Sequence, residues 1–289
     1  MKTFLTFLLL FTGTYSFAQQ LPARWDELTA TDFPAALDKS AQTCILPFGI
    51  LEKHGPHAPI GNDLIHVREW AAHATKLEYA VVFPDYFYGQ INEARHQPGT
   101  FALPSRVMFD LLEATCDEIA RNGFKKIVIL NGHGGNPEFI RFFMQSFLNK
   151  RHNYVIYFYA PDTDDADYDV QYQKMHKTPT KGDMHAGESE TSVTMYYRHD
   201  LVQIDRATQQ SGANQKRSNL PNLYTPIWWY ASFPNHYAGD ASKATPEFGK
   251  LIAEHEISTF VKALKTIKAD TTTLRLQNEF YDKVDNLNK

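Results

Sequence analysis

The chain has few cysteines and no surplus of positive charge. Its 289 residues include only two cysteines, Cys44 and Cys116, which excludes the disulfide framework of a small secreted scaffold. We expect both thiols to be buried and unpaired, with a disulfide between them as the alternative. The 29 Lys and Arg residues stand against 33 Asp and Glu, a net charge of −4 that argues against a nucleic-acid partner.

Long hydrophobic runs are also lacking. The apolar run at residues 4–11 is too short to span a bilayer, and no other segment approaches the roughly 20 residues that a span requires. Because the run follows Lys2 and precedes the small residues of 16–18, it predicts a secretory signal peptide at residues 1–18. A buried N-terminal helix is the alternative. We therefore expect a protein exported to the periplasm or secreted.

Beyond the leader, the pattern alternates between strands and helices. We expect strands where short apolar runs occur and helices where apolar residues recur every three or four positions. Such alternation predicts an α/β fold whose parallel sheet is covered on both faces. No linker divides the chain, so residues 19–289 are predicted to form a single domain. The strands are expected at 44–51, 80–84, 127–130 and 154–159, and the helices at about 64–77, 105–122, 137–150, 188–199 and 246–268.

The first motif that carries chemistry follows the strand 44–51. Glu52 and His54 are two residues apart, so in extended backbone both side chains project from one face and can each reach a metal ion. Asp63 comes after a loop rich in Gly and Pro, and its two oxygens could bridge two ions. A Glu-x-His pair alone is usually a surface pair, but this context favours a site.

The second motif is the glycine-rich segment 131–136, directly after the strand 127–130. Glycines let the backbone bend sharply and approach a ligand closely. In open α/β sheets, ligands bind beyond the carboxyl ends of the strands. We therefore interpret His133 as a site residue, with an ordinary loop histidine as the alternative.

The third motif, residues 182–192, opens a helix. Glu188 and Glu190 would complement the helix dipole in its first turn, but that role does not account for His185 beside them. On a helix, residues two apart diverge by about 200°, so the two glutamates are not expected to share one ion.

These three motifs, together with residues 239–247, resemble the signatures of the creatininase (creatinine amidohydrolase) family. The resemblance runs in register from about residue 44 to 253. It implies a three-layer α/β/α sandwich with a mostly parallel sheet. It also implies a dinuclear metal site that hydrolyses cyclic amides or related C–N bonds, on a small-molecule substrate and often in a homo-hexamer.

The resemblance also implies a set of metal ligands. Glu52, Asp63 and His133 would hold one ion, and His54 and Asp63 the other, with Asp63 bridging. The ligand atoms of such a site are carboxylate oxygens and imidazole nitrogens. This set suits Zn²⁺, Mn²⁺ or Fe²⁺ and does not distinguish among them.

One ligand position departs from the family pattern. Creatininase has a glutamate two residues after the loop histidine, where this chain has Gly135. We expect Glu190 to supply the missing carboxylate, with Glu188 as the second choice. Glu188 would otherwise work with His185 on proton transfer, so both of these are predicted as catalytic residues.

The predicted mechanism uses two ions about 3.5–4 Å apart, which turn a bridging water into hydroxide near neutral pH. This metal-bridging hydroxide adds to the substrate carbonyl, and His185 moves a proton to the departing nitrogen. Two alternatives stay open: a metal-dependent hydrolase of a formamide or lactone, and a non-catalytic binding protein of the same fold.

The sequence also offers candidates for the substrate pocket. Arg95, His96 and the pair Trp228 and Trp229 are candidates for the substrate pocket, with packing or a solvated loop as the alternative. The pattern around residues 88–100 and the segment before His185 differ from creatininase, which leaves the substrate open. No role is predicted for the remaining histidines, which lack ligand spacing: His66, His73, His152, His176, His199, His236 and His255.

Overall fold

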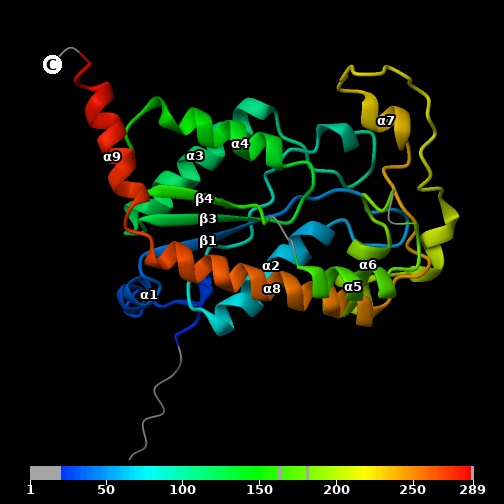
Figure 1. Ribbon diagram of the computed structural model, residues 1–289, viewed down its shortest axis with the longest axis horizontal. Helices are drawn as coiled ribbons and strands as arrows, with labels where there is room; N and C mark the ends of the chain where they lie inside the picture. The colour runs from blue at the N-terminus through cyan, green and yellow to red at the C-terminus, as the bar shows by residue number, and fades with distance from the viewer. Residues whose placement is uncertain (1–20, 162–164, 180–181, 288–289) are drawn as a thin grey trace, which may run out of the picture.

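The computed structural model describes residues 21–161, 165–179 and 182–287 (Figure 1). The signal peptide predicted at residues 1–18 lies outside these residues. Among the described helices, none is both long enough and apolar enough to cross a membrane.

A parallel sheet forms the centre of the fold. The four strands run in the order β2-β1-β3-β4, so β1 and β3 are neighbours although β2 lies between them in sequence. In the register, Cys44 pairs with Val81 on one side and with Ile127 on the other. The apolar, β-branched runs are typical of strands buried on both faces. The strands are β1 (Thr43–Phe48), β2 (Val81–Val82), β3 (Lys126–Asn131) and β4 (Val155–Tyr159).

Two helices cover one face of the sheet, α2 (Asn62–Leu77) and α8 (Pro246–Ala269). There, Val128 of β3 packs in one cluster with Trp70 and Phe260 from these two helices. Helix α8 begins cleanly because Pro246 fits the first helical position and the Thr245 hydroxyl accepts the Phe248 amide hydrogen.

The opposite face is covered by α3 (Ser105–Arg121) and α4 (Pro137–Ser146). Ile129 of β3 packs there with Leu112 and Phe143, whereas its neighbour Val128 points to the other face. Figure 1 shows α3 and α4 above the strands and α2 and α8 below them. The predicted three-layer α/β/α sandwich is confirmed.

The structure also contains helices that the sequence did not predict. They are α1 (Phe33–Lys39), α5 (Ala166–Met175), α7 (Trp228–Ser232) and α9 (Thr273–Val284). Helix α6 (Glu188–Arg198) is the one expected at 188–199. Short 3₁₀ turns complete the list: η1 (Trp25–Glu27), η2 (Asn92–Ala94), η3 (Phe147–Asn149), η4 (His199–Leu201) and η5 (Ile204–Gln209).

Most predicted bounds differ from the structure by one or two residues, and three elements are clearly shorter than expected. The strand expected at 80–84 is reduced to Val81–Val82. The strand expected at 44–51 ends at Phe48, where the chain turns out of the sheet, so Glu52 and His54 lie in a loop. The helix expected at 137–150 ends at Ser146 and continues as η3. The change at β1 matters because it frees both side chains to turn toward a neighbouring strand end.

The two cysteines are free and fully buried, as expected. Cys44 on β1 and Cys116 on α3 belong to the same apolar cluster. Burial raises the pKa of both thiols far above its usual value, so both behave as small apolar side chains.

The order of the strands defines where a ligand is expected to bind. From β1 the chain passes through α2 on one face to β2, and from β2 it passes through α3 on the other face to β3. The crossovers therefore diverge between β1 and β3, and this switch point is where open α/β sheets bind ligands. The first two motifs leave the sheet at these two strand ends.

Candidate metal centre

Four predicted site residues meet beyond the ends of β1 and β3, and we call them the sheet-end cluster: Glu52, His54, Asp63 and His133. His54 Nε2 lies 2.8 Å from Asp63 Oδ1. His133 Nδ1 lies 3.0 Å from Asp63 Oδ2 and 2.9 Å from Glu52 Oε1. All four side chains are buried. The Asp63 carboxylate therefore faces one histidine with each of its oxygens.

Close backbone packing brings these residues together. Gly132 donates its amide hydrogen to the Phe48 carbonyl over 3.0 Å, which ties the exit of β3 to the end of β1. A side chain at Gly132 would meet the Asp63 carbonyl oxygen at 2.7 Å, and one at Gly49 would meet the Leu64 backbone at the same distance. Only glycine permits two strand ends and the first turn of α2 to touch in this way.

Backbone carbonyls orient the histidine rings. His133 Nε2 lies 3.1 Å from the Gln90 carbonyl and His54 Nδ1 lies 3.3 Å from the Glu52 carbonyl. A ring nitrogen facing a carbonyl carries a proton, so the other nitrogen, which faces the carboxylates, is the one that could give a lone pair to a metal ion. This is how metal-binding histidines are held in proteins.

The cluster also contains ligand atoms that the protein leaves unsatisfied. Among the described residues, Glu52 Oε1, His54 Nε2 and Asp63 Oδ2 are buried without a hydrogen bond of good geometry. Buried polar atoms normally make hydrogen bonds, and a buried polar atom without one costs stability. Two triads have ligand atoms within 4.8 Å of one another: Glu52, Asp63 and His133, and Glu52, His54 and His185. The residues therefore fit divalent cations.

The carboxylates of the cluster raise the pKa values of its histidines. Burial alone would lower the pKa of His54, but Asp63, Glu52 and Glu190 raise it to about 9. Glu52 and Asp63 also raise the pKa of His133 well above its usual value, against the effect of burial. In the metal-free protein these histidines take up protons to balance the acids, a role that a cation would fill.

Helix α6 and the segment before it add two predicted residues at the edge of the cluster, Glu190 and His185. Glu190 Oε2 lies 3.8 Å from His54 Nε2 and 3.9 Å from His185 Nδ1, and it accepts the Ala186 amide hydrogen over 2.6 Å. His185 Nε2 faces the Lys53 carbonyl at 2.8 Å, so its Nδ1 carries the lone pair. Burial, as the largest effect, lowers the pKa of His185 to about 3. This imidazole is therefore neutral near pH 7.

The structure does not bring Glu188 into the sheet-end cluster. Its carboxylate is fully buried and accepts the amide hydrogens of Lys177, at 2.9 and 3.0 Å, and of Thr178, at 2.7 Å. Since Glu188 and Glu190 diverge on the helix, one faces this loop and the other faces His54. The expectation that Glu188 shares proton transfer with His185 has no support in these contacts, because its oxygens hold a backbone turn.

Glu188 belongs to a second buried group, which we call the α6 brace: His176, Asp183, Glu188 and Ser189. Asp183 Oδ2 accepts the Ser189 amide hydrogen at 3.1 Å and the Ser189 hydroxyl hydrogen at 2.6 Å. The same oxygen lies 2.9 Å from His176 Nε2. The brace fastens the segment before α6 to its first turn.

One buried histidine at the cluster has no predicted role. His236 Nε2 donates to Glu52 Oε2, and His236 Nδ1 accepts the Trp229 indole hydrogen over 2.8 Å. Sequence reasoning missed it because His236 lies 184 residues from Glu52, in a loop without ligand spacing. The neighbouring Gly-Asp segment at 239–240, one of the family signatures, was the signal that could have marked this loop.

A cleft of about 900 Å³ opens beside the cluster. The predicted pocket residues Arg95, His96, Trp228 and Trp229 all line it. Glu93 lines it too, and its Oε1 would lie 3.2 Å from a side-chain carbon placed at Gly135. The same carbon would clash with His133 Nε2 at 2.4 Å, so the departure at Gly135 has a local cause: a larger residue has no room there.

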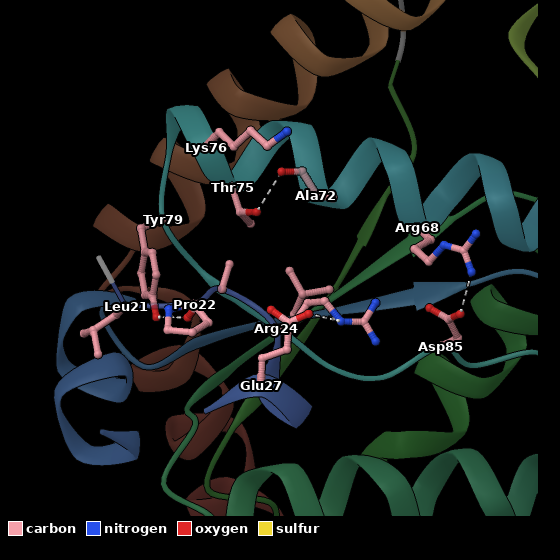
Figure 2. Close-up of a pocket in the computed structure, with 12 residues that line it drawn as sticks. Leu21, Pro22, Arg24, Glu27, Arg68, Ala72, Thr75, Lys76, Tyr79 and Asp85 are labelled. Atoms are coloured by element: carbon pink, nitrogen blue, oxygen red, sulfur yellow. Dashed lines mark hydrogen bonds and ion pairs between the residues drawn. The ribbon is translucent and has the colours of Figure 1, made fainter. Parts of the chain in front are cut away.

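Figure 2 shows a second cavity, of about 340 Å³, at the edge of the sheet near Tyr79. It contains none of the predicted site residues. Both of its carboxylates pair with an arginine, Asp85 with Arg68 and Glu27 with Arg24. It therefore lacks the unsatisfied ligand atoms that distinguish the sheet-end cluster.

The three-layer fold and the buried cluster of acids and histidines at the switch point define an α/β protein with a candidate metal site. Comparison with known families matches residues 26–264 to Creatininase, creatinine amidohydrolase. The chain belongs to the creatininase family, and the expected class of enzyme, a hydrolase of amide C–N bonds, is confirmed.

Individual relatives are more distant. The chain is similar to creatinine amidohydrolase of Pseudomonas putida, 29% identical over 119 residues, which cover 39% of this chain and 46% of that enzyme. It is also similar to 3-dehydro-scyllo-inosose hydrolase of Thermotoga maritima, 26% identical over 255 residues, covering 79% and 78%. The first alignment thus spans about half of the creatinine amidohydrolase.

Solved structures confirm the fold. A crystal structure of creatininase superposes with a TM-score of 0.73 at 22% identity, covering 86% of this chain and 99% of that one. Other creatininase structures of the same fold include a Zn-Zn type and a manganese form.

Proposed function

We propose that this protein is an exported hydrolase that uses two divalent metal ions to cleave the C–N bond of a cyclic amide or related small molecule. The observation that carries the proposal is the sheet-end cluster with its unsatisfied ligand atoms. Family membership supports amide hydrolysis, and the open cleft beside the cluster supports a small-molecule substrate.

Within the site, Asp63 is the proposed bridging ligand. Its two oxygens face His54 and His133 separately, at 2.8 and 3.0 Å. Glu52 and His133 complete one side, and His54 and Glu190 the other. Between Glu188 and Glu190, the geometry favours Glu190, which lies near His54, whereas the Glu188 oxygens are held by backbone amides. Zn²⁺, Mn²⁺ and Fe²⁺ all suit these donors.

When bound, such ions polarise a substrate carbonyl and lower the pKa of a coordinated water, which is the chemistry that amide hydrolysis needs. His185 would move the proton. Its Nε2 is fixed on the Lys53 carbonyl, so Nδ1 is the atom that can accept a proton and return it to the departing nitrogen. The products are a carboxylate and a free amine, joined in one molecule when the substrate is cyclic.

A metal and substrate survey tests the proposal. Elemental analysis of the purified protein should find two divalent ions per chain. A panel of cyclic amides, N-formyl compounds and lactones should show turnover of an amide, with the Asp63→Ala variant as the inactive control. Turnover of lactones or formamides alone would select the alternative hydrolase, and absence of bound metal would favour a binding protein.

Export and assembly form a separate part of the proposal. The signal pattern at residues 1–18 supports cleavage after Ala18 and a mature domain of 19–289. The family resemblance supports a homo-oligomer, a hexamer being the form expected. Mass spectrometry of the native protein should find an N-terminus near Gln19, and light scattering should find a mass several times that of one chain. An intact Met1 or a monomer would contradict the respective part.

A further inference from the structure

We propose that Trp229 and His236 form a positioning relay that holds the Glu52 carboxylate in place and presents one of its oxygens to the metal ions. This rests on the proposed function, because it concerns how the chain prepares a ligand of the same site. Neither residue belongs to the ligand set expected from the sequence.

The hydrogen bonds run in one direction. The Trp229 indole has only a donor, so His236 Nδ1 accepts its hydrogen over 2.8 Å. His236 Nε2 therefore carries the ring proton and donates it to Glu52 Oε2. These two hydrogen bonds fix the tautomer of the His236 ring, with the proton on Nε2.

The two oxygens of the Glu52 carboxylate have different surroundings. Oε2 is satisfied by His236, whereas Oε1 is buried without a hydrogen bond of good geometry, 2.9 Å from His133 Nδ1. Glu52 would thus bind through Oε1 alone, while Asp63 can offer both oxygens. A carboxylate held by a hydrogen bond on one oxygen cannot rotate between binding modes, which is how outer contacts tune metal affinity.

The turn that carries His236 is itself anchored to the site. Lys53, which lies between the two ligands Glu52 and His54, donates from Nζ to the Asn235 carbonyl over 2.7 Å. His96 Nε2 meets the Pro234 carbonyl at 3.0 Å. His236 has a φ of 50°, a left-handed conformation that side chains other than glycine seldom adopt. Such backbone conformations persist where the surroundings hold them, and they gather at functional sites.

Trp229 connects the relay to the cleft. Trp229 lines the 900 Å³ cleft, and its indole nitrogen donates a hydrogen bond to His236, the residue that contacts Glu52. Its neighbour Trp228 also lines the cleft, but among the described residues it makes no hydrogen bond or ring contact with His236 or Glu52. The two tryptophans therefore make a matched pair in which one belongs to the relay and the other does not.

The test is a Zn²⁺ titration of the metal-free mature protein against a chromophoric chelator, with tryptophan emission recorded in parallel. His236→Phe should bind Zn²⁺ about 10- to 100-fold more weakly, the range for lost contacts behind a ligand. His236→Gln, whose amide can still donate to Glu52, should recover most of the affinity. Trp229→Phe should show a smaller loss, and Trp228→Phe none.

Emission separates positioning from a merely structural effect. Zn²⁺ should change the emission of the wild type and of Trp228→Phe but not that of Trp229→Phe, because only Trp229 is hydrogen-bonded to the Glu52 side of the site. If His236→Phe fails to fold, Trp229→Phe and His236→Gln still decide the question.

The failures are distinguishable. Wild-type affinity for Zn²⁺ in both His236→Phe and Trp229→Phe would overturn the relay while leaving the metal site intact. Equal weakening in His236→Phe and His236→Gln would also overturn it. Zn²⁺ binding by the wild type no tighter than by Asp63→Ala would instead overturn the proposed function.

Discussion

Two buried groups of acids and histidines lie close together in this protein and differ in how their oxygens are satisfied. In the α6 brace, the carboxylate oxygens of Asp183 and Glu188 accept hydrogens from backbone amides and a hydroxyl. In the sheet-end cluster, oxygens of Glu52 and Asp63 are buried without hydrogen bonds of good geometry.

The difference teaches how to distinguish a brace from a ligand site. Both groups contain the same residue types, so composition alone does not separate them. A satisfied carboxylate stabilises the fold, and removing it leaves backbone amides unpaired. An unsatisfied, buried carboxylate costs stability and is explained by a cation that the residues are arranged to bind. Substitutions in the two groups should therefore have opposite signatures.

The largest effect is expected for Asp63→Ala. Both ions should be lost, and hydrolysis should fall by about three orders of magnitude, about 4 kcal/mol in the activation barrier. The metal-free protein should lose less stability than in Glu188→Ala, because His54 and His133 can release the protons that balanced the removed carboxylate. Elemental analysis, kinetics and thermal unfolding measure these three results. Two ions per chain in Asp63→Ala would refute the bridging assignment.

Glu188→Ala should show the reverse signature. Loss of the charge-assisted bonds to Lys177 and Thr178 should lower the free energy of unfolding by about 3 kcal/mol. The metal content of the folded fraction should stay the same. Chemical denaturation of the metal-free protein gives the first value and elemental analysis the second. A variant of normal stability that loses metal would instead make Glu188 a ligand.

Glu190→Gln allows a comparison with Glu188→Ala, because both residues lie in the first turn of α6. One of the two ions should bind at least about tenfold more weakly, a change of about 1.4 kcal/mol. The stability of the metal-free protein should stay within about 0.5 kcal/mol, as for other substitutions outside the core. Calorimetric titration with Zn²⁺ resolves the two sites. Unchanged affinity at both would exclude Glu190 from the ligand set.

The smallest effect concerns a third pair, His66 and Glu256, which lies outside both groups. Its atoms lie 2.7 Å apart, and Glu256 raises the pKa of His66 although burial alone would lower it. A histidine with a raised pKa adds stability that is complete below its unfolded pKa of about 6.5 and is lost as the pH rises through the folded value.

Glu256→Gln should therefore cost about 1 kcal/mol near pH 6 and less near pH 9. Unfolding of the metal-free wild type and variant at both pH values measures the difference. A cost that grows with pH would show that the pair does not act through the charged imidazole.

Much of the fold followed from periodicity. The strands around Cys44 and Ile127 and the helix from Pro246 were predictable because apolar spacing records which face is buried. Helices α5 and α7 were not, since α5 buries no residue and α7 has only five residues. Local patterns carry little signal where a helix contributes so little to the core.

The candidate site was predictable where motifs leave neighbouring strands. Glu52 and His133 follow β1 and β3, whose adjacency is a property of the fold class. His236 was not predictable, because its contact with Glu52 depends on a turn held by Lys53 and His96. The direction of Glu188 was also hidden, because a returning loop, not the helix itself, provides its partners.

The two-residue strand β2 has a consequence for association between chains. Its outer side is already occupied, since Val82 donates its amide hydrogen to the Ala23 carbonyl and Arg24 bridges to Val82. At the opposite edge, the Gln277 side chain donates to the carbonyls of His152 and Tyr154, just before β4 begins. A short edge strand with an occupied outer side offers a poor template for a foreign strand, so β2 does not favour edge-to-edge aggregation.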